Sequence, residues 1–330
     1  MEMESRITEL GALADPLVEP AEGCATTRLM VPGLGLWHSA TATSSEPAMF
    51  EPRLYVVLRG SKTMTFATRH ARMTPGMFAL SSVGVPFTTG VESAPYLGVG
   101  LELSAAKIGE MLSILPSFPA KQAPTIAIGQ LEQDLLEPIS RLLGMCHRHG
   151  EPPILGPLVV EEIHYRMLTG RFGDTVRQLH SGGRRMTQIR KAIALLKTTE
   201  DPLPDVATLA RAVGMSMTSF HRHFKMVTGH GPLEYGKHLR LLKARDMLMG
   251  QGSSIAETAH VVGYLSASQF SREYKREFGI SPRHDVQNSS VEAVWYDHEH
   301  NTAAVAAYQK AEASSGLKQS VKDRCGTSTI

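Results

Sequence analysis

Cysteine is scarce in this chain of 330 residues. Only Cys24, Cys146 and Cys325 are present, far apart and odd in number. Such a set supports neither a disulfide framework nor a zinc site, whose cysteine ligands come in closely spaced pairs. The sequence therefore predicts a protein of a reducing compartment, the cytoplasm, with no metal.

Long hydrophobic runs are absent as well. No apolar segment approaches the ~18 residues that a membrane-spanning helix needs. The first residues, Met1 to Ser5, are acidic and not the cationic start of a secretion signal. We expect no membrane partner.

The N-terminal part has few of the side chains that metal enzymes use. Its first 130 residues contain two histidines, His38 and His70, at no ligand spacing, so three ligands on one metal are hard to assemble. We find no nucleophile elbow, phosphate loop or suitable Cys–His pair in the sequence. The chain is therefore predicted not to be an enzyme and to need no cofactor.

Charge is nearly balanced over the whole chain but not within it. Residues 182–285 contain 16 Lys and Arg against 9 Asp and Glu, a net charge of +7, which leaves −5 for the rest of a chain whose total is +2. A basic segment beside an acidic remainder is typical of a nucleic-acid-binding domain joined to a regulatory module. The length suffices for two such domains.

Two stretches of the basic segment each predict a helix-turn-helix unit, from Val206 to Phe224 and from Ile255 to Tyr274. Each has an alanine-rich apolar helix, a glycine, a polar turn and a second helix with aromatic residues four apart. Glycine ends a helix cheaply in the left-handed region, and serine accepts a hydrogen bond at the next helix start. The helix-ending glycine and the helix-starting serine are Gly214 and Ser216 in the first unit, and Gly263 and Ser266 in the second.

The outward positions of the second helix in each unit are small polar or basic. Base edges are read by hydrogen bonds and phosphates are bound by cations, so these positions predict DNA contact. The candidate DNA-binding residues are Thr218, Ser219, His221, Arg222 and Lys225 in the first unit and Ser268, Gln269, Ser271 and Arg272 in the second. Arg222 and Arg272 are equivalent, which favours a shared contact to bases; contact to phosphates only is the alternative, and plain helical packing is the alternative for both units.

The stretch between the units, Pro232 to Met249, predicts a connecting helix. Its 18 residues would span ~27 Å, whereas successive major-groove segments lie roughly 34 Å apart. One chain is therefore expected to enter the major groove of double-stranded DNA at two successive half-sites, with bending of the DNA covering any shortfall.

These residues resemble the AraC/XylS family of bacterial transcription regulators. Besides the two units, Arg240 to Leu248 is similar to the family's linker helix and Phe278 to Pro282 to its closing signature. The resemblance covers about Met186 to Arg283. It implies that bases are read by Thr218, His221, Arg222, Ser268, Gln269 and Arg272.

The chain departs from the family pattern at three places. Thr218 is small where some members have a large side chain, and Tyr274 stands where phenylalanine is usual. Arg283-His284-Asp285 replaces the usual Tyr-Arg end, which leaves the C-terminal edge of the domain open.

Short β-like runs cut by glycine and proline fill residues 28–103. Gly60, between two such runs, predicts a hairpin, and Pro75-Gly76 predicts a tight turn. The stretch resembles the small cupin-like barrel of one branch of the same family, through Leu54 to Lys62, Pro75-Gly76 and Pro95 to Glu102. The resemblance implies a barrel that holds a small-molecule effector at its mouth. The candidate pocket residues are Trp37, His38 and Tyr55, with a core or rim position as the alternative.

The rest of the chain completes an α+β architecture. Helices expected at 104–115, 130–147 and 154–169 either cover the barrel or form a homodimer interface, which the resemblance favours. The expected parts are an N-terminal arm (1–24), the cupin-like regulatory and dimerisation domain (25–170), a flexible linker (171–185), the tandem helix-turn-helix domain (186–285) and a mostly disordered tail (286–330), in which a docked helix at about 303–313 is the alternative.

Two functions remain open at this point. The first is a sequence-specific transcription regulator of the bacterial cytoplasm, located at the nucleoid when bound, that responds to an effector in the barrel. The second is a DNA-binding regulator whose barrel only dimerises. Both leave room for a contact with RNA polymerase.

Overall fold

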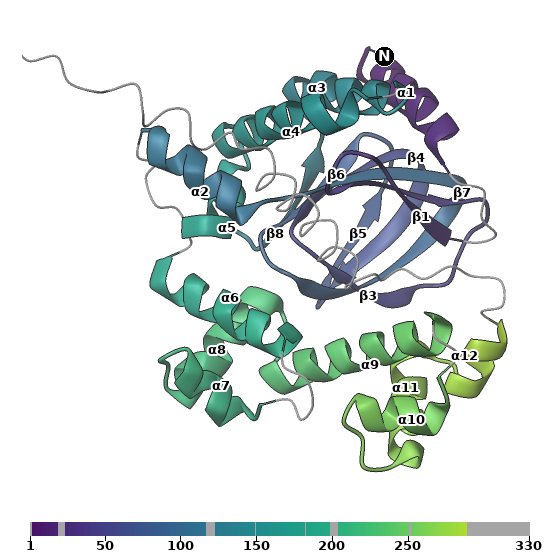
Figure 1. The fold of residues 1–330 in the computed structure, drawn as a ribbon, viewed down its shortest axis with the longest axis vertical. Coiled ribbons are helices and arrows are strands. Elements are labelled where there is room, and N and C mark those ends of the chain that lie inside the picture. Colours follow the sequence, from purple (N-terminus) through teal and green to yellow (C-terminus); the bar gives the residue numbers. More distant parts are fainter. Residues whose placement is uncertain are drawn as a thin grey trace, which may run out of the picture. The chain divides into compact units, whose positions relative to one another are not determined.

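The computed structural model describes residues 2–18, 24–116, 123–148, 150–181, 183–198, 204–250 and 253–288 (Figure 1). An antiparallel sheet domain is followed by a helical domain with two helix-turn-helix motifs, which confirms the predicted fold class. Residues 289–330, including the alternative helix at 303–313, lie outside the described residues. Within the described ranges, no helix is both long and apolar enough to cross a membrane.

Eight strands form one sheet, which curls into the cupin-like barrel (Figure 1). The strand order is β1-β2-β7-β4-β6-β8, while β3 pairs with β7 and β5 pairs with β4. Side chains alternate between the two faces of each strand. The strands are β1 (Cys24–Arg28), β2 (Leu34–Ser39), β3 (Glu46–Phe50), β4 (Arg53–Phe66), β5 (Arg69–Met73), β6 (Met77–Ser81), β7 (Val85–Glu102) and β8 (Ile126–Gln130).

The prediction of a hairpin at Gly60 is wrong, because β4 continues without a turn through this residue. The pairing of β4 with β7 shifts register between Val57 and Lys62. Gly60 has a φ of 69°, and a Cβ atom there would lie 2.3 Å from the carbonyl oxygen of Ser93. Gly60 therefore marks a bulge where the backbones approach closely, and bulges bend strands. The turn predicted at Pro75-Gly76 is confirmed.

Helices cover the outer face of the sheet. Leu54, Val56 and Leu58 of β4 pack there in one core with residues of α1, α3, α4 and α5. Burial of such side chains contributes about 1.5–3 kcal/mol each. Figure 1 shows α1, α3 and α4 along one side of the sheet. The helices of this domain are α1 (Glu2–Ala14), the 3-10 helix η1 (Asp15–Leu17), α2 (Ala105–Ile114), α3 (Gln133–Met145), α4 (Pro152–Thr169) and α5 (Gly173–Ser181).

Two segments are more ordered than the sequence indicated. In the N-terminal arm, Ile7 and Leu10 of α1 lie in the core, 3% and 2% exposed. The flexible linker expected at 171–185 instead contains α5, whose Val176 and Leu179 are buried in the same core. A segment that buries apolar side chains in a core cannot act as a free linker.

Seven helices of the described chain form the C-terminal domain: α6 (Gly183–Thr198), α7 (Val206–Ala212), α8 (Met217–Thr228), α9 (Pro232–Gly250), α10 (Ile255–Val261), α11 (Ala267–Phe278) and α12 (Pro282–Asn288). The two units are α7–α8 and α10–α11, and α9 connects them as predicted. Gln188 of α6 donates hydrogen bonds to the carbonyl oxygens of Val213 and Gly214, and so caps the end of α7. The turn of the second unit is one residue longer than that of the first.

Candidate nucleic-acid interface and barrel cluster

Helix α8 is anchored by two aromatic rings. Phe220 and Phe224 are fully buried, with ring centroids 5.5 Å apart, and Phe224 meets Tyr235 of α9 at 5.3 Å. The helix begins where expected, because the Ser216 hydroxyl accepts a hydrogen bond from the Ser219 amide and Gly214 has a φ of 66°. These contacts set which side of α8 faces outward.

The outward side of α8 carries the predicted residues. Thr218, His221, Arg222 and Lys225 are exposed, and Ser219 is half-buried. The neighbouring His223 is buried, and its Nδ1 lies 2.7 Å from the Ser219 carbonyl oxygen. His223 is therefore a packing residue, while four side chains of α8 are free to meet a duplex.

Helix α11 repeats this arrangement around Phe270 and Tyr274, which are fully buried with centroids 5.5 Å apart. Gly263 ends the preceding helix with a φ of 85°. Ser266 does stand at the N-cap, but its side chain makes no capping hydrogen bond, so the predicted cap is wrong. The longer turn changes the approach of the chain to this helix start, and here the Ser266 φ is −141°, against −67° at Ser216.

The outward side of α11 also carries the predicted residues. Ser268, Gln269 and Arg272 are exposed, and Ser271 is half-buried. The Arg272 Nε donates to the Ser268 carbonyl oxygen at 3.3 Å, and the Gln269 amide donates to Glu273 at 3.4 Å. Weak hydrogen bonds thus direct both side chains along the helix surface.

One candidate was missed on this side. Lys275 is exposed and stands in α11 where Lys225 stands in α8, four residues after the equivalent of His221. An alignment of the two units on Phe220 and Phe270 reveals it. The lysine pair offers each helix one cation for a phosphate.

On the inner face of the sheet, the structure brings two of the three candidate pocket residues together. The rings of Trp37 and Tyr55 lie edge to face at 5.4 Å. His38 is next to Trp37 on β2 and therefore points to the opposite face, where its Nε2 lies 3.3 Å from the Thr27 hydroxyl. His38 is thus separate from the Trp37–Tyr55 pair.

Three further residues, Arg53, Lys62 and Tyr96, join this pair and were not predicted. The Tyr96 hydroxyl lies 2.6 Å from the Tyr55 hydroxyl. The Lys62 Nζ lies 4.7 Å from the Tyr55 ring centroid and 5.5 Å from that of Tyr96. Arg53 places its guanidinium 4.9 Å from the Trp37 ring. We call Trp37, Arg53, Tyr55, Lys62 and Tyr96 the barrel cluster.

The environment of the barrel cluster changes the protonation of its members. Burial raises the pKa of Tyr55 and of Tyr96 above the usual range of a phenol. Burial also lowers the pKa of Lys62 to about 8, with Cys24 raising it and Arg53 lowering it further. At neutral pH the cluster therefore holds two phenols and an ammonium group. The sequence signal for this site was a lysine, Lys62, within the β-like stretch of residues 53–66.

In the part of the chain that the structure describes, no three side chains of His, Cys, Asp or Glu come together as metal ligands. The two sites that the structure does provide are a pair of outward-facing polar helices and a cationic, aromatic cluster inside the sheet.

Comparisons with known proteins match both domains. A family model described as the N-terminus of AraC-type transcriptional regulators matches residues 30–175, and one described as a helix-turn-helix domain matches residues 209–288. The apo form of a ToxT variant from Vibrio cholerae has a similar fold, with a TM-score of 0.55 at 9% identity over 81% of this chain and 99% of that chain.

Two curated relatives show the sequence similarity. GbdR, an HTH-type transcriptional regulator of Pseudomonas aeruginosa, is 34% identical over 113 residues, which are 34% of this chain and 30% of GbdR. RhaS, an HTH-type transcriptional activator of Salmonella paratyphi B, is 26% identical over 159 residues, which are 47% of this chain and 55% of RhaS. The matched stretches thus span 30% of GbdR and 55% of RhaS. With both domain models matched in order along one fold, the chain belongs to the AraC family of transcriptional regulators.

Proposed function

We propose that this protein is a sequence-specific transcription regulator that binds double-stranded DNA through α8 and α11. One observation carries the proposal. Two helices present exposed polar and basic side chains, each is held by a pair of buried rings, and a single helix, α9, joins them. Such helices fit successive segments of the major groove. Arg222 and Arg272 are the main candidates for base contacts.

The barrel is proposed to control this binding by accepting a small-molecule effector. Its strand β3 touches the C-terminal domain, since the Arg245 guanidinium meets Glu46 at 2.7 Å and the His238 Nε2 lies 3.3 Å from the Ala48 carbonyl oxygen. Strand β3 pairs with β7, which also carries Tyr96 of the barrel cluster. These contacts between β3 and the C-terminal domain are proposed to exist in a formed and a broken arrangement. An effector that binds one arrangement more tightly than the other would shift the equilibrium between them.

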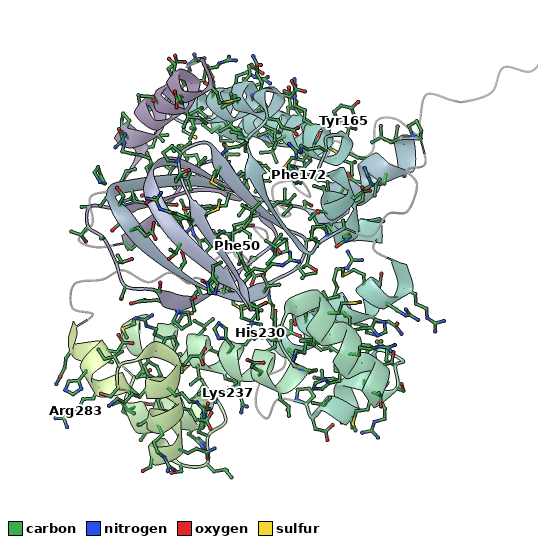
Figure 2. All side chains as sticks on the ribbon, turned by 180° about the vertical axis from the view of Figure 1, so that it is seen from behind. Phe50, Tyr165, Phe172, His230, Lys237 and Arg283 are labelled. Carbon is green, nitrogen blue, oxygen red and sulfur yellow. The ribbon has the colours of Figure 1, made fainter. Side chains whose placement is uncertain are left out.

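A homodimer is part of the same proposal. Helix α4 has large apolar side chains on its outer side, and Figure 2 shows Tyr165 directed away from the helix layer. Ile154 and Leu158 are 72% and 61% exposed, one helical turn apart. A stripe of this kind can be buried against the same stripe of a second copy. Ile154→Glu with Leu158→Glu should then shift the sedimentation coefficient from dimer to monomer.

The DNA proposal is tested with Arg222→Ala and Arg272→Ala against operators altered in one half-site at a time. Each variant should lose ~1–3 kcal/mol of binding free energy on the parent operator, and each should become insensitive to changes in a different half-site. Arg72→Ala, an exposed arginine of the barrel, is the control. Equal weakening on every sequence would reduce both residues to phosphate contacts, and unchanged binding would refute the proposed interface.

The alternative, a barrel that only dimerises, is tested on the same protein. Effector binding raises the unfolding temperature by mass action, so pools of bacterial metabolites should raise it if the barrel accepts one of them. If no pool raises it and operator binding is normal, the barrel only dimerises.

A further inference from the structure

The barrel cluster combines a buried ammonium group and a half-buried guanidinium with aromatic rings. Lys62 is 3% exposed, Tyr55 3% and Tyr96 2%, so these groups have little access to bulk water. Gly98 and Gly100 of β7 make room for the rings: a Cβ atom would lie 2.3 Å from the Tyr55 hydroxyl oxygen at Gly98. The strand is thus shaped to accept aromatic side chains against its backbone.

Arg53 carries a second, independent sign of a ligand. Its Nε atom is buried and has no hydrogen-bond partner, although the guanidinium lies within 4.0 Å of Glu102 on another nitrogen. A buried donor without a partner destabilises the fold, and more so where the group is charged. Such a donor is retained where something else accepts its hydrogen bond.

The two phenols leave one more donor. Their hydroxyls are 2.6 Å apart, so one donates to the other, and the hydrogen of the second needs a further acceptor. Arg53 and Tyr55 are two residues apart on β4 and so point to the same face. Both contact the Trp37 ring. Two directed donors on one face, beside the Lys62 ammonium, match the two oxygens of a carboxylate.

We propose that the barrel cluster binds a small organic monocarboxylate, with its carboxylate on Arg53 and the tyrosine pair and its apolar body against Trp37. The two directed donors favour a carboxylate over a phosphate, which has more oxygens to satisfy. The lowered pKa of Lys62, about 8, still leaves the ammonium charged at neutral pH. The proposal rests on the proposed function, because it gives the effector of the barrel a chemical class.

The test uses the full chain with Trp295→Phe, which leaves Trp37 as the single tryptophan of the two present. Benzoate, phenylacetate and hexanoate are titrated beside their uncharged amides, and Trp37 emission and the unfolding temperature are recorded. At least one carboxylate should change the emission saturably, and its amide should bind at least ten-fold more weakly.

Variants then locate the site. Arg53→Gln and Lys62→Met should each weaken carboxylate binding at least ten-fold, while Arg72→Gln and Lys107→Met, on exposed ion pairs of the same domain, should not. Lys62→Met removes a buried charge and is expected to fold at least as stably as the parent. If it does not fold, Arg53→Gln alone decides.

Three outcomes overturn the proposal: no binding of any carboxylate, equal binding of the amides, or unchanged binding in both cluster variants. Operator binding by the same preparations separates this result from the proposed function. Normal operator binding with no carboxylate bound refutes only the effector class. Carboxylate binding without any operator binding refutes the regulator.

Discussion

The hydroxyl of Tyr274 donates a hydrogen bond to the carboxylate of Asp285, 2.5 Å away. These residues lie at two of the three places where the sequence departs from the family pattern, and in the structure they form a hydrogen bond with each other. Asp285 is 4% exposed and also accepts from Arg245 at 3.0 Å and 3.3 Å. The C-terminal edge that the sequence left open is therefore α12, which this contact ties to α11 and α9.

Removal of that hydroxyl should destabilise the C-terminal domain. Tyr274→Phe should lower the free energy of unfolding by about 1.5–3 kcal/mol, because it removes a buried hydrogen bond to a charged group. Urea unfolding of the full chain measures this. Tyr264→Phe is the matched control, since the Tyr264 hydroxyl bonds to the more exposed Glu273 at 3.1 Å. An equal loss in the two variants would contradict the special role of Asp285.

Between the domains, Lys197 of α6 meets both carboxylate oxygens of Glu51, at 2.5 Å and 2.6 Å. Both side chains are about one-fifth exposed, so solvent screens the pair only in part. Lys197→Glu should weaken the contact by about 1 kcal/mol or more and alter operator affinity. The double variant Lys197→Glu with Glu51→Lys, in which the two charges are exchanged, should recover at least half of the change in operator affinity. A double variant that behaves as the sum of its parts would show that the pair does not couple the domains.

His164 should make the barrel domain sensitive to acid. Its Nδ1 donates to the Val160 carbonyl oxygen at 2.7 Å and its Nε2 accepts from the Ser104 amide at 3.0 Å, an arrangement that requires the neutral ring. Burial lowers the pKa of His164 below its usual value of 6.5. The unfolded chain therefore binds a proton at His164 more readily than the folded chain does. The contribution of the neutral His164 ring to folding stability is complete above about pH 6.5 and is lost as the pH falls below it.

Thermal unfolding between pH 8 and pH 5 measures this effect. The unfolding temperature of the parent should fall more steeply below pH 6.5 than that of His164→Gln, which has no proton to bind. His147→Gln, an exposed histidine of the same domain, serves as the control and should keep the parent's pH dependence. If the unfolding temperatures of the parent and of His164→Gln depend on pH in the same way, His164 is not the cause of the acid sensitivity.

Gly98 of β7 should tolerate a methyl group far less well than Gly35 of the neighbouring strand β2. Gly98→Ala would place a Cβ atom 2.3 Å from the Tyr55 hydroxyl oxygen, whereas at Gly35 the nearest atoms, in the Trp37 ring, lie 3.4 Å away. Gly98→Ala should therefore cost about 1–3 kcal/mol of unfolding free energy. Gly35→Ala should be neutral within about 1 kcal/mol. Similar losses at both positions would show that the clash at Gly98 is relieved easily.

The helix-turn-helix units were predictable because their signals are local. Gly214 and Gly263 adopt the left-handed conformation that the pattern predicts, and Ser216 caps α8. The outward residues follow from helical periodicity once the buried rings are known. Ser266 fails as a cap because the extra residue in its turn changes the backbone, and a pattern of residue types does not register that change.

The barrel was harder to predict because its features depend on distant strands. Gly60 looks like a turn until Ser93 of β7 is placed against it. Lys62 and Tyr96 are 34 positions apart and meet only through the pairing of β4 with β7. The supposed linker at 171–185 contains a short helix whose two apolar residues find a core formed by α3, α4 and the sheet. Tertiary contacts of this kind override local composition.

Helix α9 has 19 residues in one uninterrupted run, about 28 Å at 1.5 Å per residue. A rigid helix of this length fixes the rotation of α11 relative to α8 about the helix axis as well as the distance between them. Five base pairs inserted between the half-sites would turn one of them to the far side of the duplex, about half a helical turn. One residue inserted into α9 would rotate the second unit by about 100°. The relative rotation of the two helix-turn-helix units must therefore match that of the two half-sites. We expect a single-codon insertion in α9 to abolish regulation although the outward side chains of α8 and α11 are unchanged.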